Sequence, residues 1–358
     1  MSELAAIQKA YGGVIAANYD GCEIFMMNVG NADCFLVIRY YRGGTKDVIL
    51  IDGGNTSDAE SIVQRIKNLG ITHIDYVVNT HPHDDHAAGL VEIIKDTSLT
   101  FGALWLHASW TRIDANAIRA MLGRNSAKWV LEAFEKSLAT QMALFNACCS
   151  RSISVYEPFE GVTIGPFKVI GPTPEFYTTC MAKFSDLTTI TQWNDYLSNS
   201  SLRQLMAIFQ KEAVQTEEEL GGVTSPENES SVIMTLDCGD KRLLFCGDAG
   251  CDAFGDIIAR QQIAHLHDIH WMHAPHHGSR RNLWQEAITY FKPKTVFISS
   301  KGSRKHPSLK LVNAFIKNGA KVYSSHYPPE NRFVWLRYPV GNVPPRNVIP
   351  ATALYEAD

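Results

Sequence analysis

Short apolar runs and helical patterns alternate along most of the chain. Three runs near its N-terminal end read EIFMMNVG, CFLVIRYY and DVILIDGG, and their β-branched and aromatic residues favour strands. A Gly-Gly turn, RGGTK, separates the last two, so the pattern predicts a β-meander. The next segment, SDAESIVQRIKNLG, places its apolar residues on one helical face, with Ser57 and Glu60 as a capping box and Gly70 as the C-cap.

A strand-to-helix unit follows, because IDYVVNTH predicts a strand and GLVEIIKD a helix. Residues 110–146 then have a helical pattern interrupted by GRNSAK, and FKVIGPTP returns to a strand. Residues 176–224 hold helix-like and polar stretches without strong strand signals. We interpret this segment as an insertion that forms a lid or a surface module.

Sheet character resumes at SVIMTLDCGDKRLLFCGD, which predicts a hairpin with a turn near Gly239. Predicted helices at 252–261, 281–291 and 308–318 then alternate with predicted strands at 268–274 and 294–299. Short strands are expected near Lys321 and Phe333. Sheet-rich halves with outer helices predict a layered α/β or α+β domain.

The composition of the 358 residues is that of a globular protein, with 45% hydrophobic and 20% charged residues. Met1–Asp20 lacks a basic stretch followed by a long apolar one, and no uninterrupted apolar run reaches about 18 residues. We therefore expect neither secretion nor a membrane-spanning segment. The eight cysteines form no CxxC pair of the zinc-ribbon kind, which favours reduced thiols in a cytoplasm.

Charge is unevenly spread along the chain. The net charge of -4 argues against a protein that coats nucleic acid through charge alone. Between Arg280 and Lys310, however, eight basic residues face a single acid, Glu286. This basic run could surround a site for phosphate, or it could be an ordinary solvated helix face.

The stretch NTHPHDDHAAGL concentrates metal-binding residue types between the predicted strand and helix. On an extended strand end His81 and His83 point to the same side, so their imidazoles can share one cation. Asp85 and His86 lie one turn further on and could hold a second cation. Such ligands suit zinc, manganese or iron. The alternative is a polar helix N-cap in which Asp84 and Asp85 complement the helix dipole.

The motif HxHxDH resembles the signature of the metallo-β-lactamase-fold hydrolases. Further stretches are similar, in order, to the branch that contains the hydrolase domain of ComEC-type competence proteins: MMNVGNADCFLV, LIDGG, NESSVIM, LLFCGDAG, APHHGS and HPS. Asn28 replaces that branch's first aspartate. The resemblance covers about residues 23–325 and implies a single domain over 1–358, a four-layer αββα sandwich with a core of about 23–340 and a helical insertion at 176–224.

The resemblance also implies a set of metal ligands. His81 and His83 would bind the first metal, Asp85 and His86 the second, and Asp248 would bridge both, although an aspartate in GDAG can also be a simple turn former. The family's third histidine at the first metal is missing here. Asn228 is the nearest match, as a weaker ligand or as a plain turn-forming asparagine.

The last ligand of the second metal is ambiguous between APHHGS and KHPS. The order of elements resembles family members in which the later histidine closes the site, which favours His306 as the ligand. His276 and His277 then become catalytic candidates, for substrate contact or as general acid, together with Asp85. Asp52 of LIDGG is expected to orient a ligand histidine. The remaining histidines have no supporting spacing and are taken as ordinary: His107, His265, His267, His270 and His326.

These residues predict a binuclear metal-dependent hydrolase with two divalent ions, zinc or else manganese. Paired cations lower the pKa of water and take up charge on substrate oxygens. The branch and the basic run favour a phosphodiesterase or nuclease-like enzyme acting on a small-molecule or nucleic-acid phosphodiester, without a membrane partner. Alternatives are a carbonyl ester, lactone or β-lactam hydrolase, a diiron oxygen or nitric oxide reductase, and a catalytically silent binding module. The diiron class usually has glutamate where His83 stands.

Overall fold

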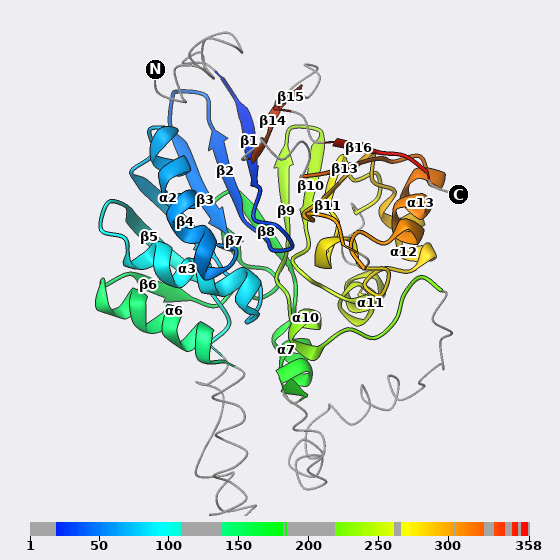
Figure 1. The fold of residues 1–358 in the computed structure, drawn as a ribbon, viewed down its shortest axis with the longest axis horizontal. Coiled ribbons are helices and arrows are strands. Elements are labelled where there is room, and N and C mark those ends of the chain that lie inside the picture. Colours follow the sequence, from blue (N-terminus) through cyan, green and yellow to red (C-terminus); the bar gives the residue numbers. More distant parts are fainter. Residues whose placement is uncertain are drawn as a thin grey trace, which may run out of the picture.

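The described residues form two eight-stranded sheets that pack face to face, with helices on their outer faces (Figure 1). The computed structural model describes residues 19–108, 138–181, 183–184, 219–260, 266–303, 305–325, 333–340, 346–349 and 352–356. This αββα layering confirms the predicted sandwich of mixed α and β elements.

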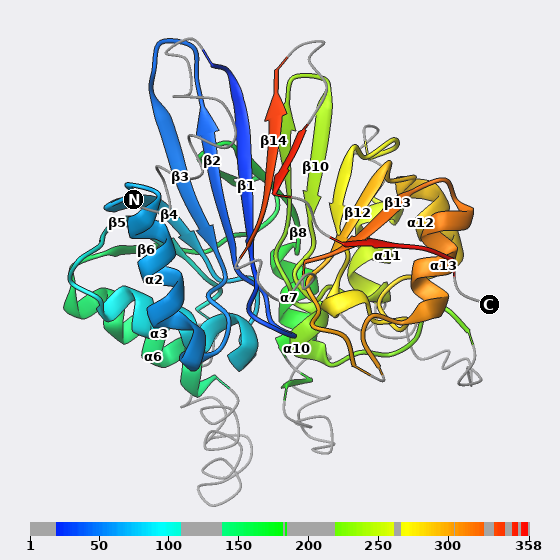
Figure 2. The same cartoon turned by 45° about the horizontal axis from the view of Figure 1, so that its top comes forward.

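The first sheet contains the N-terminal meander and the strands that lead to the histidine motif. Its order is β15 (Arg346–Ile349), β14 (Phe333–Pro339), β1 (Gly21–Met27), β2 (Phe35–Tyr40), β3 (Lys46–Ile51), β4 (His73–Val78), β5 (Thr100–Trp105) and β6 (Ser154–Tyr156). Strands β1 to β3 are antiparallel, which confirms the meander, and β3 to β6 are parallel. Figure 2 shows β14, from the C-terminal part, beside β1.

The second sheet is built from the later part of the chain. Its order is β16 (Thr352–Leu354), β13 (Lys321–Ser324), β12 (Thr295–Ile298), β11 (Trp271–His273), β10 (Lys241–Phe245), β9 (Ile233–Cys238), β8 (Phe167–Gly171) and β7 (Thr163–Ile164). The predicted hairpin is β9–β10, and β10 to β13 are parallel.

Helices cover the outer face of each sheet (Figure 1). The first sheet is covered by α2 (Ala59–Asn68), α3 (Asp84–Lys95) and α6 (Ala139–Ser150), and the second by α11 (Cys251–Ala259), α12 (Gln285–Phe291) and α13 (Leu309–Lys317). Between the sheets, Phe35 packs edge-on against Phe245 at 5.7 Å between ring centroids, and Phe245 contacts Trp271 at 4.8 Å. Burying each such side chain stabilises the fold by about 1.5–3 kcal/mol.

The start of the first long helix differs from the prediction. A 3-10 turn, η1 (Thr56–Asp58), precedes α2, and the Asn55 N–H donates to Asp58 Oδ2 at 2.9 Å. The expected capping box of Ser57 and Glu60 is therefore wrong, because Ser57 already lies inside the turn. The predicted end is confirmed: Gly70 has φ +74° and its N–H donates to the Lys67 carbonyl.

Two predicted segments lie largely outside the described residues. Of the helical pattern at 110–146, the structure describes only the part that enters α6. Of the insertion at 176–224, it describes α7 (Pro174–Met181), residues 183–184 and residues 219–224. Within the described ranges, the helices are all too short or too polar to cross a bilayer. All eight cysteines are free thiols.

Candidate metal centre

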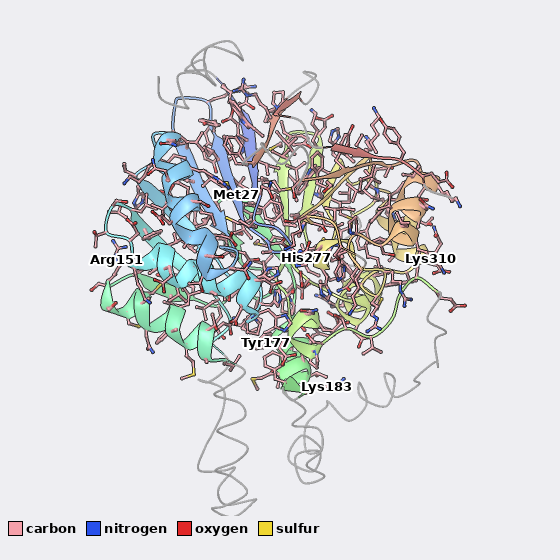
Figure 3. All side chains as sticks on the ribbon, in the orientation of Figure 1. Met27, Arg151, Tyr177, Lys183, His277 and Lys310 are labelled. Atoms are coloured by element: carbon pink, nitrogen blue, oxygen red, sulfur yellow. The ribbon has the colours of Figure 1, made fainter. Side chains whose placement is uncertain are left out.

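The candidate ligands lie where parallel strands of both sheets end. Asp52 follows β3 and His81 lies three residues after β4 in the first sheet, and Asp248 lies three residues after β10 in the second. Carboxyl ends of parallel strands meet at one edge of a sheet, so side chains far apart in sequence converge there. Figure 3 shows His277 near the middle of the molecule, between the two halves.

A first group of potential ligands consists of His81, His83 and Asp248. His81 Nε2 lies 3.2 Å from His83 Nδ1 and 3.8 Å from Asp248 Oδ2. Two atoms bound to one tetrahedral zinc ion at about 2.0–2.1 Å lie roughly 3.3 Å apart. The spacing of this group therefore suits one divalent cation, and His81 and Asp248 are buried.

A second group consists of Asp85, His86 and His277. His277 Nε2 lies 3.2 Å from Asp85 Oδ2, and His86 Nε2 lies 3.9 Å from Asp85 Oδ1. Asp248 joins the two groups, because its Oδ1 is 3.3 Å from His86 Nε2 while its Oδ2 faces His81. One carboxylate thus contacts both groups, as in two-metal sites whose ions lie about 3.5–4 Å apart.

The imidazoles of the second group are held through their Nδ1 atoms. His86 Nδ1 lies 2.8 Å from Asp52 Oδ2, and Asp52 also accepts hydrogen bonds from the N–H and hydroxyl of Thr80. This confirms that Asp52 contacts a histidine of the motif. His277 Nδ1 lies 3.0 Å from the carbonyl of Ser299, which only accepts, so Nδ1 carries the proton. In both rings the Nε2 lone pair is left to face the carboxylates.

The electrostatics of the centre favour added positive charge. Burial lowers the pKa of His86, but the Asp248 and Asp85 carboxylates outweigh burial and raise it well above its usual value. Burial also opposes protonation of His277, yet the nearby carboxylates of Asp33 and Asp85 raise its pKa to about 10. Burial, followed by His86, lowers the pKa of His81 well below its usual range. Divalent cations would satisfy the same carboxylates and displace those protons.

Buried polar atoms without a hydrogen-bond partner test whether metal ions fit here. His86 Nε2 and Asp248 Oδ1 are buried and face each other at 3.3 Å without forming a hydrogen bond. Such atoms are expensive unless something else binds them. Nitrogen and oxygen donors with free lone pairs at this spacing fit a divalent metal ion.

The structure brings His277, rather than the expected His306, to Asp85 and His86. His276 and His277 lie in a short turn, η4 (His276–Gly278), and both have positive φ, at +50° and +53°. The Ser308 N–H donates to the Gly278 carbonyl, so the loop with His306 packs against this turn. The His306 ring stacks on His276 at 5.4 Å and lies 6.3 Å from His277.

His276 and Asn228 lie together near Asp248. His276 Nε2 is 3.8 Å from Asp248 Oδ2, and its side chain is 29% exposed. Asn228, in α10 (Pro226–Glu229), is buried, and its amide nitrogen donates to the Thr224 hydroxyl and lies 3.3 Å from His276 Nδ1. Among the residues that the structure describes, its Oδ1 has no hydrogen-bond partner, and Asn228 as a metal ligand stays a prediction.

Several residues of the centre escaped the sequence patterns. Asp33 lies in the stretch NVGNADCFLV, where an acidic residue next to an apolar strand pattern could have indicated a functional role. His273 is the last residue of β11. Gln141 of α6 donates to the Asn79 amide oxygen at 2.8 Å, and Asn79 donates to the His81 carbonyl. The sequence around Gln141 does not indicate its role, because its hydrogen-bond partner, Asn79, lies 62 positions away in the chain.

Only part of the basic run lies near the centre. Lys310 is at the outer edge of the molecule, away from His277 (Figure 3), and Lys292 pairs with Asp268 at 3.8 Å. Lys301 packs beside Gly30, and its N–H is held by Asn31 Oδ1 at 3.0 Å. The expectation that the whole run surrounds the site is therefore wrong. Of the loop that contains Lys301, it is His306 that reaches His276, at 5.4 Å between ring centroids.

Comparisons with known proteins agree with this architecture. The sequence model of the metallo-beta-lactamase superfamily matches residues 27–121, which include the histidine motif. Comparison with curated proteins gave no match.

The solved structures that the comparison matched include three enzymes. A variant of the β-hydroxylase CmlA shares 11% identity and a TM-score of 0.41 over 85% of this chain and 52% of its own. A long-form RNase Z from yeast has 11% sequence identity and a TM-score of 0.37, and the match covers 81% of this chain and 38% of the RNase Z. The dizinc quorum-quenching lactonase AidC has 10% identity and a TM-score of 0.31, and the match covers 91% of this chain and 92% of AidC. The chain thus spans about half of the first and less of the second. At such scores these likenesses say nothing about activity.

Proposed function

Because the chain contains a metallo-beta-lactamase superfamily domain whose histidine motif meets a bridging aspartate, we propose that it is a binuclear metal-dependent hydrolase acting on phosphodiesters. The observation that supports this most is the position of Asp248, whose two oxygens face His81 on one side and His86 on the other. The proposal includes zinc as the preferred ion, manganese as the alternative, and the likeness to the ComEC-type branch.

Two divalent ions held by these residues would supply Lewis acidity and make water a nucleophile at neutral pH. His81, His83 and Asp248 would hold one ion, and Asp85, His86 and His277 the other, with Asp248 shared. The contribution of Asp52 is to keep the His86 ring oriented, since carboxylates behind ligand histidines fix the tautomer and raise basicity.

His276 is placed to handle a proton at the open side of the centre. Asn282 donates its amide hydrogens to the carbonyls of Asp248 and Ala249, so its oxygen faces His276 Nδ1 at 3.1 Å. This oxygen lies closer to Nδ1 than the Asn228 amide nitrogen at 3.3 Å does, which favours the tautomer with the proton on Nδ1. We propose that His276 contacts substrate through Nε2 and passes a proton from that atom to the leaving-group oxygen.

Phosphodiesters are favoured over carbonyl substrates by the charge near this opening. Lys305 directly precedes His306, whose ring stacks on His276, and Lys301 lies in the same loop. Positive charge beside a metal centre attracts phosphate and is not needed for a lactone or β-lactam. Both a small-molecule and a nucleic-acid phosphodiester fit this proposal, and the free cysteines agree with a reducing cytoplasm.

The test combines metal analysis with a substrate panel and two neighbouring variants. The purified protein is expected to bind two ions and to cleave bis(p-nitrophenyl) phosphate, with Asp85→Ala losing at least about a hundredfold in activity. Asp84→Ala is the matched control, because it removes the same charge from the same helical turn, where Asp84 accepts a hydrogen bond from the Thr140 hydroxyl. If the protein hydrolyses a chromogenic lactone or β-lactam but no phosphodiester, the phosphodiester proposal is wrong and the protein is a carbonyl hydrolase. Two bound ions without any turnover would indicate a binding module.

A further inference from the structure

Asp33 is a fully buried carboxylate that lies behind the candidate metal centre. Asp33 lies in the loop between β1 and β2. The residue is 0% exposed, and neither of its carboxylate oxygens has a hydrogen-bond partner within the described residues. A buried, uncompensated carboxylate is costly, and such groups persist in folded proteins when they are paired or serve a site.

Three imidazoles surround the Asp33 carboxylate. His273 Nε2 lies 3.3 Å from Oδ2, His277 Nδ1 lies 3.7 Å from Oδ1, and His86 Nδ1 lies 4.0 Å from Oδ2. The backbone holds Asp33 in place, since its N–H donates to the Asp85 carbonyl and its carbonyl accepts from the Gly54 N–H. The carboxylate is thus anchored to the same loops that present the second ligand group.

The orientation of these rings shows what Asp33 can do. In His86 and His277 the atom that faces Asp33 is Nδ1, whereas Nε2 faces Asp248 and Asp85. Asp33 therefore lies on the side of both rings opposite to the expected metal ion. A negative charge in this place stabilises the Nδ1–H groups and increases the electron density at Nε2, which strengthens metal binding.

Asp33 contacts only the second group in this way. In the first group, His81 Nδ1 lies 3.1 Å from the Thr80 hydroxyl, a neutral partner. Asp33 also lies with His86 and Asp248 in a group whose potential ligand atoms are within 4.8 Å. A third metal there is disfavoured, because His86 Nδ1 is already committed to Asp52 at 2.8 Å.

We propose that Asp33, paired with His273, is a positioning residue of the second metal site: its negative charge acts on the Nδ1 side of the imidazoles of His86 and His277 and so sets the affinity of the second ion relative to the first. This inference rests on the proposed binuclear centre. It explains a buried acid and a buried histidine that the hydrolytic chemistry does not otherwise use.

The experiment measures the two metal affinities separately. Zinc is titrated into metal-free wild type and the isosteric Asp33→Asn variant against a competing chelator, and cobalt absorption follows the geometry of each site. Asp33→Asn is expected to bind the first ion as wild type does and the second about 10–100-fold more weakly. Glu23→Gln is the matched control, because Glu23 is a buried acid paired with Arg337, away from the centre. It is expected to keep the ratio of the two affinities even if the fold is less stable.

The outcomes separate this inference from the proposed function. Fewer than two ions bound by wild type would overturn the binuclear centre itself. Two ions in wild type with unchanged affinities in Asp33→Asn, or with both affinities reduced equally, would overturn only the role of Asp33. If the Asp33→Asn variant fails to fold, the His273→Gln variant tests the inference instead, because it removes the imidazole that lies nearest to the Asp33 carboxylate. Zinc is then expected to raise the unfolding temperature more than in wild type, and an equal or smaller rise would overturn the inference.

Discussion

Helix α3 approaches the loop after β3 so closely that two glycines meet. A Cβ built on Gly89 would lie 1.8 Å from the Gly53 carbonyl oxygen, where real Cβ contacts essentially never fall below 3.0 Å. The contact is backbone against backbone, so no side chain can move aside. Two hydrogen bonds of 2.9 Å hold it, from the Gly53 N–H to the His86 carbonyl and from the Gly89 N–H to the Gly54 carbonyl.

Gly89→Ala is therefore expected to separate the helix from the loop. The two elements must move apart by at least 1.2 Å, the difference between 1.8 Å and 3.0 Å. That movement breaks both hydrogen bonds, at about 0.5–1.5 kcal/mol each, in addition to about 1–3 kcal/mol for overpacking. The free energy of unfolding should fall by about 2–6 kcal/mol, which for a chain of 358 residues corresponds to roughly 3–8 °C in the unfolding temperature.

The same movement should reach the metal centre. The first turn of α3 contains Asp85 and His86, and functional geometry tolerates shifts of only about 0.5 Å. Gly89→Ala is thus expected to lose the second ion even where the protein remains folded. Thermal unfolding and metal analysis measure the two effects.

Gly255→Ala is the matched control, since Gly255 lies inside α11 and an added Cβ would meet nothing within 4 Å. It should stabilise the protein by about 0.5–1 kcal/mol. An unfolding temperature of Gly89→Ala equal to that of wild type, with two ions still bound, would refute the reasoning.

Three further outcomes follow from the contacts around the centre. Asp52→Asn removes the carboxylate behind a ligand ring, so the zinc affinity of the second site should fall about 10–100-fold in a chelator competition. The His277→Ala variant should bind one metal ion and the His306→Ala variant two. The reverse result would indicate that His306, rather than His277, is a ligand of the second ion. Gln141→Leu leaves the buried amide oxygen of Asn79 without its donor, so urea unfolding should show a loss of about 1–3 kcal/mol, and a neutral result would contradict a stabilising role of this hydrogen bond.

The grouping of the candidate ligands that lie close together in sequence could be predicted from the sequence itself. His81, His83, Asp85 and His86 occupy one strand-to-helix connection, and the geometry of that connection follows from the local hydrophobic pattern. The strands of the meander and of the β9–β10 hairpin could also be predicted, because they pair with neighbours that lie close in sequence. Asp248 could be found because a buried strand leads directly to it.

Contacts between distant segments were decided by the tertiary structure. The approach of His277, rather than His306, to Asp85 and His86 depends on how the loop before α13 packs over η4, and this packing has no signature in either segment. Asp33 and Gln141 reach the centre through partners far away along the chain, at Asp33–His273 and Gln141–Asn79. Sequence periodicity reports which face of an element is buried, whereas the neighbour across that face depends on the packing of the two sheets, because this packing sets the distances between side chains.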